Sequence, residues 1–168
     1  QHRYPDVQAV HRLDLDTSGL MVVPKRRESL SELARQFQRR QIDKEYTAIV
    51  WGEVAEDRGS IELPIATDWP NRPKQIICEE RGKHALTHFE VLKRGYNRSL
   101  IKLKPVTGRS HQLRIHMQSF GHPIIGCDMY AHPKALEASD RLLLHATRLK
   151  LCAPSTGHWL SAFSPIPF

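Results

Sequence analysis

Short strand-like segments outnumber helical ones along this chain, and this imbalance restricts the fold more than any other feature. Segment 19–24, GLMVVP, is continuously apolar and is predicted to be a buried strand. Because strands and helices do not alternate regularly, a doubly wound parallel sheet is not expected. The sequence predicts an α+β fold with a mixed, largely antiparallel curved sheet and a few flanking helices. The other strand-like segments are 7–10, 45–52, 60–65, 84–93, 99–105, 142–151 and 158–163.

Two segments have helical periodicity. Ser29 and Glu32 have the spacing of a capping box, and the apolar residues that follow recur at helical intervals, which predicts a helix over residues 30–40. A second helix is predicted over residues 110–120, with Gly121 as its C-terminal cap. The chain is thus expected to pack two helices against its sheet.

The balance of charged residues favours a nucleic-acid partner. The 168-residue chain, which fits a single domain, has 25 Lys and Arg residues against 18 Asp and Glu residues, a net charge of +7. Nucleic acid is the usual partner for such an excess, and a basic protein without an anionic partner is the alternative. Nothing approaches the roughly 18 consecutive apolar residues that a membrane span needs, so no membrane association is expected.

The cysteines and histidines do not suggest a metal site. The three cysteines lie far apart without a C-x-x-C pair, which argues against a disulfide framework and a structural zinc ion and favours a reducing cytoplasm. His111 and His116 are five positions apart, whereas two ligands on one helical face need a spacing of about three or four. We therefore expect a cytoplasmic protein without a metal.

A polar segment, HRLDLDTS at residues 11–18, separates the first two apolar segments and holds Asp14 and Asp16. Catalytic groups favour loops that rigid strands support. An ionised carboxylate can act there as a nucleophile or a base. The alternative is a turn in which these side chains only satisfy backbone amides.

A second polar segment precedes the second predicted helix. The run TGRS at residues 107–110 is typical of a tight turn into a helix N-terminus, where backbone amides attract anions, but it lacks the Gly-Lys-Ser/Thr pattern of a P-loop. Arg109 and Arg114 are five positions apart and need not face the same way. One could contact RNA phosphate while the other contacts a carboxylate.

Three aromatic residues are candidates for stacking on unpaired bases, as aromatic side chains near basic ones do in RNA-binding proteins. Tyr46 and Trp51 lie in a predicted strand. We expect Trp51 in the core, and both readings stay open for Tyr46. Trp69 is the better surface candidate, because it lies near Arg72 in segment 68–75, DWPNRPKQ, whose two prolines break regular structure.

Five ordered motifs together resemble the RluA-type pseudouridine synthases. HRLDLDTSGL resembles the family's H-R-L-D-x-x-T-S-G motif and KEYTAIVWG its K-x-Y strand, and TGRSHQLRIHM, GHPIIG and RLLLHA match later segments. The resemblance implies a pseudouridine synthase catalytic domain over residues 1–168, without an S4-type domain. The loop DWPNRPKQ resembles the RluA branch, whose members modify a large-subunit (23S) rRNA loop and the tRNA anticodon stem-loop.

The resemblance implies an isomerase that converts uridine to pseudouridine in structured RNA without a cofactor. Asp14 corresponds to the family's essential aspartate, which either attacks C1′ or removes the 2′ proton. Tyr46 matches the tyrosine that packs on the target base, and Arg114 the arginine that pairs with the aspartate. Base flipping is required because C1′ and C5 are inaccessible in a stacked strand.

Further residues are expected around this catalytic group. Arg12 matches the arginine that fills the gap left by the flipped nucleotide, and Leu143 is expected in the apolar wall of the uracil pocket. The residues expected to bind RNA or to assist flipping are His11, Arg12, Trp69, Arg72, Arg109 and His111.

The chain departs from the family pattern at two places. Cys127 stands where the family has Asp after the glycine of P-I-x-G, and Asp128 follows it. The family's N-terminal strands with a V-N-K-P-x-G-like segment are absent, so we expect part of the sheet to be missing. We expect a monomer that acts on tRNA and rRNA. The alternatives are a non-catalytic RNA-binding or RNA-folding module and a glycosidase of small sugars, which would need a second acid such as Asp16.

Overall fold

The computed structural model describes residues 7–168, which form a seven-stranded sheet, a two-stranded sheet and three helices. The strands are β1 (Ser18–Gly19), β2 (Asp43–Trp51), β3 (Arg58–Glu62), β4 (Ile65–Thr67), β5 (Gln75–Ile77), β6 (Leu86–Gly95), β7 (Arg98–Pro105), β8 (Leu144–Cys152) and β9 (Trp159–Phe163). The helices are α1 (Arg27–Gln38), α2 (Gln112–Ser119) and α3 (Pro133–Glu137).

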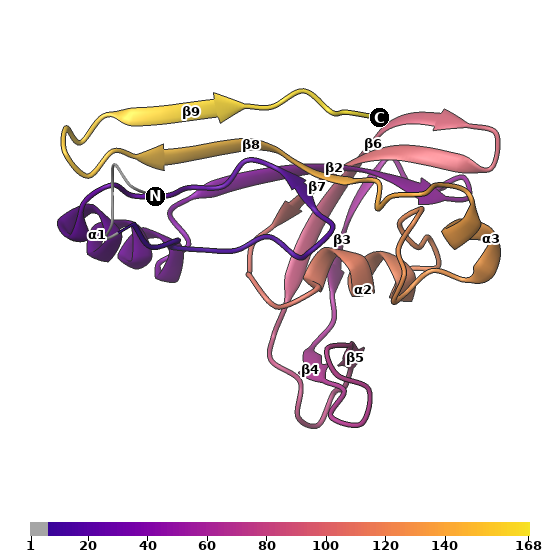
Figure 1. The fold of residues 1–168 in the computed structure, drawn as a ribbon. Coiled ribbons are helices and arrows are strands. Elements are labelled where there is room, and N and C mark those ends of the chain that lie inside the picture. Colours follow the sequence, from indigo (N-terminus) through magenta and orange to yellow (C-terminus); the bar gives the residue numbers. More distant parts are fainter. Residues whose placement is uncertain (1–6) are drawn as a thin grey trace.

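The large sheet has the strand order β1-β8-β2-β7-β6-β3, and β9 also pairs with β8. Only β1 pairs with its neighbour in parallel; the other strands of this sheet are antiparallel. The predicted mixed, largely antiparallel sheet is therefore confirmed. The three helices lie on the same side of this sheet, and the small β4–β5 sheet projects beyond them (Figure 1).

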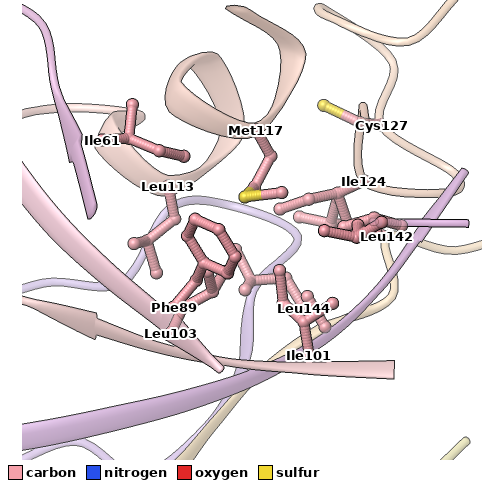
Figure 2. Packing of buried hydrophobic residues seen from close by; sticks show 13 residues of the cluster. Ile61, Phe89, Ile101, Leu103, Leu113, Met117, Ile124, Cys127, Leu142 and Leu144 are labelled. Atoms are coloured by element: carbon pink, nitrogen blue, oxygen red, sulfur yellow. The ribbon is translucent and has the colours of Figure 1, made fainter. Parts of the chain in front are cut away.

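The main core lies between the large sheet and α2. Ile101 and Leu103 of β7 are fully buried, and Figure 2 shows Leu113 and Met117 of α2 packed over the same group as Phe89 of β6. Each buried side chain of this size contributes about 1.5–3 kcal/mol by leaving water. This packing fixes α2, and so it also fixes the segment that leads into it.

The prediction of a buried strand over residues 19–24 is wrong. Strand pairing ends at Gly19, and the last bond to β8 is donated by the Leu20 amide to Ala146 O, at 3.0 Å. Met21 and Val23 are exposed, because the segment leaves the sheet and packs only alternate residues against α1. A continuously apolar sequence here reflects packing on a helix rather than burial on both faces of a strand.

The predicted helices are present with different ends. The capping box is wrong: α1 already begins at Arg27, so Ser29 lies inside it, and its N-cap residue, Arg26, makes no side-chain bond to the helix. Helix α2 begins after His111, and Gly121 follows its last turn at φ +88°, as predicted. The short α3 and the small β4–β5 sheet were not predicted, since each has only a few residues of pattern.

Gly19 permits the close approach of β1 to β8. It has φ +111°, and a Cβ at this position would lie 2.4 Å from Ala146 O. We expect Gly19→Ala to lower the free energy of unfolding, measured by urea denaturation, by at least about 2 kcal/mol. Gly157→Ala is the matched control, since Gly157 has φ +72° with no atom near its missing Cβ. Equal losses in the two variants would show that backbone conformation alone, and not the contact with β8, requires Gly19.

Candidate active site

A cavity of about 850 Å³ opens on the helix side of the sheet, between the segment that precedes β1, the end of α1, β2, the β4–β5 hairpin and the segment that precedes α2. It brings together residues that are more than a hundred positions apart in the sequence. The predicted site residues that line it are His11, Arg12, Asp14, Tyr46, Arg72, Arg109 and His111. Arg114, Trp69 and Leu143 do not line it.

Asp14 and Tyr46 come from different elements and meet in the cavity. The Thr17 amide donates to Asp14 O at 3.0 Å, which closes a turn around the partly buried aspartate. Tyr46 projects from β2 on the helix side of the sheet, and its pKa is raised to about 12 by burial and further by the Asp14 carboxylate. An aromatic ring with a protonated hydroxyl therefore stands near a carboxylate, an arrangement that can hold a planar ring and move protons.

A chain of side-chain hydrogen bonds holds the Asp14 segment to β8. Ser18 Oγ accepts from Arg141 Nη2 at 2.9 Å, so its own hydrogen is available to His145 Nδ1 at 2.8 Å. The imidazole of His145 then donates from Nε2 to Ser164 Oγ at 3.0 Å. The loop that carries Asp14 is thereby tied to both β8 and the C-terminal segment.

His11 has a structural contact rather than a free imidazole. Its Nε2 accepts from the Val22 amide at 2.8 Å, and its ring stacks on Phe37 at 4.7 Å between centroids. Burial, and then the charge of Lys44, lowers the pKa of His11 to about 4. At neutral pH the ring is uncharged, so it lines the cavity without attracting phosphate.

The predicted arginines of the site, Arg12, Arg72 and Arg109, line the outer part of the cavity, which is called its rim here. Arg12 is exposed at the cavity, and Arg109 is held by a bond from its Nε to His84 O at 3.0 Å. The Arg72 guanidinium lies 3.7 Å from the centroid of the Trp69 ring, which is 61% exposed. Trp69 is therefore a surface residue, as predicted, although it supports the rim instead of lining the cavity.

Arg114 does not pair with Asp14. It is buried, forms its ion pair with Asp128 and donates from Nε to Cys127 Sγ at 3.2 Å. The expected contact is absent because α2 directs this side chain toward segment 127–131, where the guanidinium also lies 5.4 Å from the centroid of the Tyr130 ring. Asp128 neutralises Arg114, and Cys127, which stands in the place of the family's aspartate, accepts a hydrogen bond from the same guanidinium.

The apolar wall of the cavity is formed one position later than predicted. Leu144, not Leu143, lines the cavity. Leu144 belongs to the main core on the helix side of the sheet, while Leu143 precedes β8 and its backbone pairs with Ile125 and Ile49. Successive side chains of an extended segment face opposite ways, so a shift of one position changes the face.

Lys44 and Gln112 belong to the cavity lining but were not among the site residues predicted from the sequence. Lys44 lines the cavity, and burial lowers its pKa. Gln112 fixes the segment before α2, since its Oε1 accepts from Thr107 Oγ1 at 2.8 Å and from the Arg109 amide at 3.0 Å. Each of these two residues lies inside a segment that matches a family motif, Lys44 in KEYTAIVWG and Gln112 in TGRSHQLRIHM, and this is the signal that could have identified them. Within residues 7–168 no group of His, Cys, Asp or Glu side chains is placed to hold a metal, and no helix is suited to cross a membrane.

Comparison with known proteins gives a consistent result. Residues 1–119 match the family described as RNA pseudouridylate synthase. The chain is similar to the dual-specificity RNA pseudouridine synthase RluA of Vibrio cholerae, with 50% identity over 98% of this chain and 67% of the relative, and to that of Escherichia coli K12, with 46% identity over 100% and 77%. It is also similar to the structure of human RNA Pseudouridylate Synthase Domain Containing 1, with a TM-score of 0.86 and 30% identity over 99% of this chain and 72% of that one.

The neutral state of His11 gives a pH dependence of stability. In the unfolded chain a histidine titrates near pH 6.5, whereas the folded value is about 4. Between these values the unfolded state binds the extra proton, so stability is lost as pH falls from about 6.5 to 4. We expect urea unfolding to show a smaller loss over this range in His11→Gln, whose amide oxygen can still accept from Val22. The other histidines are the same in both proteins. Parallel plots of the free energy of unfolding against pH would therefore contradict the lowered pKa of His11.

Removing the countercharge of Arg114 tests its ion pair. Asp128→Asn leaves a buried guanidinium opposite a neutral amide, and we expect the free energy of unfolding to fall by about 1–3 kcal/mol, less than for a fully buried pair because Asp128 is 55% exposed. Asp140→Asn, at an exposed position, is the control and should change stability by less than about 0.5 kcal/mol. Equal effects of the two substitutions in urea denaturation would argue against a stabilising pair.

Proposed function

Because the chain belongs to the RNA pseudouridylate synthase family, we propose that its cavity isomerises uridine in a large-subunit rRNA loop and in the tRNA anticodon stem-loop, with Asp14 as the catalytic carboxylate. The family makes the chain an RNA-modifying isomerase. The observation that carries the proposed site is the meeting of Asp14 and Tyr46 in one cavity with arginines at its rim. The dual-specificity names of the relatives support two classes of RNA substrate.

The cavity suits a flipped nucleotide. Its volume of about 850 Å³ lies within the range of roughly 300–1,000 Å³ that ligand sites occupy. Flipping costs a few kcal/mol, which stacking and phosphate contacts must offset. Tyr46 and Leu144 supply apolar surface for the uracil ring inside, and Arg12 at the rim replaces the contacts that the nucleotide leaves behind.

The reaction breaks the bond between N1 and C1′, turns the uracil and joins C5 to C1′; the C5 proton is lost and N1 ends with a proton. Asp14 either attacks C1′, as a carboxylate does in retaining glycosidases, or removes the 2′ proton. The Tyr46 hydroxyl is protonated at neutral pH, because its pKa is about 12. It can accept the C5 proton only while it passes its own proton on, and the Asp14 carboxylate is the acceptor nearby.

The remaining parts of the proposal concern the molecule as a whole. We propose that residues 1–168 form one catalytic domain that works as a monomer in the cytoplasm without a metal or cofactor. The matched relatives are longer than this chain, which spans 67% of the Vibrio cholerae protein and 77% of the Escherichia coli protein. The N-terminal strands of the family remain an expectation for the longer proteins.

The catalytic role of Asp14 is tested by tritium release from tRNA and rRNA labelled with [5-³H]uridine. Asp14→Asn keeps the size and polarity of the side chain but removes its charge, so release should fall at least about 1,000-fold while RNA binding is kept. Asp16→Asn is the matched control in the same loop, at an exposed position, and should release tritium like the wild type.

Two results would contradict the proposal. Equal release by the Asp14 variant and the wild type would remove Asp14 from the chemistry. Binding of RNA without any release by the wild type would instead favour the non-catalytic RNA-binding module.

A further inference from the structure

Tyr130 lies behind the cavity wall and touches two elements that form it. Its hydroxyl is 2.8 Å from the backbone nitrogen of Gln75 in β5 and 2.8 Å from Nδ1 of His111 before α2. The Tyr130 and His111 rings meet edge to face at 5.7 Å. Gln75 and His111 both line the cavity, but Tyr130 does not. One hydroxyl thus joins two parts of the cavity wall from outside.

The hydrogens of this contact can be assigned. The backbone N–H of Gln75 can only donate, so the Tyr130 hydroxyl oxygen accepts from it. The single hydrogen of the Tyr130 hydroxyl is then free to bond Nδ1 of His111. Burial raises the pKa of Tyr130 to about 12, so the hydroxyl keeps this hydrogen. Burial also lowers the pKa of His111, against the opposing charges of Asp14 and Asp128. A neutral His111 then carries its hydrogen on Nε2.

The β4–β5 hairpin needs such a support. Two-stranded hairpins are marginal by themselves, and this one projects from the body of the molecule (Figure 1). At its base, Ile65 and Ile77 pack with Ile115 of α2 and with the Tyr130 ring. Toward the tip, Thr67, Arg72 and Pro73 line the cavity, and the Gln75 amide beside them is bonded to Tyr130. The hydrogen bond between Gln75 and Tyr130 therefore lies between the packed base of the hairpin and the part of the hairpin that lines the cavity.

We infer that Tyr130 is a positioning residue. It fixes the β4–β5 hairpin relative to the His111 imidazole, so that Arg72 of this hairpin can bind the RNA beside the cavity. This inference rests on the proposed function for its substrate. Tyr130 does not touch the RNA. Loss of the Tyr130 hydroxyl therefore weakens the binding of the substrate more than it slows the reaction at Asp14.

The test is Tyr130→Phe, which removes the hydroxyl and keeps the ring that packs on Ile65 and Ile115. We expect KM for a tRNA anticodon stem-loop to rise about 3- to 10-fold, the usual effect of one lost hydrogen bond, and kcat to change less than about 2-fold. Hydrogen exchange of the backbone amides of residues 65–77 should also become about 3- to 10-fold faster. Tyr96→Phe, at a tyrosine that is 94% exposed, is the matched control and should change none of these quantities.

Further measurements separate the outcomes. Nitrogen chemical shifts of His111 should show the Nε2–H form in the wild type and a mixture of tautomers in the Tyr130 variant. Unchanged KM and unchanged exchange would overturn the inference, and so would a fall in kcat at constant KM. RNA affinity measured in the Asp14→Asn background separates the two proposals. If it weakens with Tyr130→Phe although the wild type releases no tritium, the positioning role stands and the proposed function fails.

Discussion

The close approach of Gly19 to the backbone of Ala146 is the contact on which the rest of the site depends. At this point the segment that carries Asp14 joins β8 in parallel, with no room for a side chain between the two backbones. The same strand, β8, pairs on its other side with β2, which brings Tyr46 into the cavity. The two segments that carry the proposed chemistry therefore share one support, and the register of β8 sets their relative position.

Burial decides which side chains in and around the site carry an unpaired charge. His11 and His111 are neutral because burial lowers the pKa of each ring. The buried guanidinium of Arg114 is matched by Asp128. Lys44 lines the cavity in a partly buried position, whereas Arg12 and Arg72 are exposed at its edge. Under the proposed function, the exposed arginines would contact the RNA backbone, while the buried part of the cavity would receive the uncharged base.

Patterns in the sequence predicted elements where local rules decide and failed where contacts across the fold decide. Strand-like segments in the sequence located the main strands, and the order of the family motifs predicted that Asp14 and Tyr46 share one site. The prediction of Leu143 in the apolar wall is off by one position, because the face to which a residue points depends on where strand pairing begins, and the sequence does not mark this. The partner of Arg114 was wrong for a similar reason, since the path of segment 127–131 past α2 follows from packing.

The stacking of Arg72 on Trp69 has a consequence for the cost of binding. Long side chains at a rim normally sample many rotamers, and a ligand that immobilises them loses about 0.5–1.5 kcal/mol of affinity for each one. Here the two side chains already restrain one another, at 3.7 Å from guanidinium to ring centroid, before any RNA arrives. One face of the indole is occupied by the arginine, so an incoming base can stack only on the other. The pair therefore has less conformational entropy to lose when a ligand binds, and it leaves a single face of the indole open for stacking.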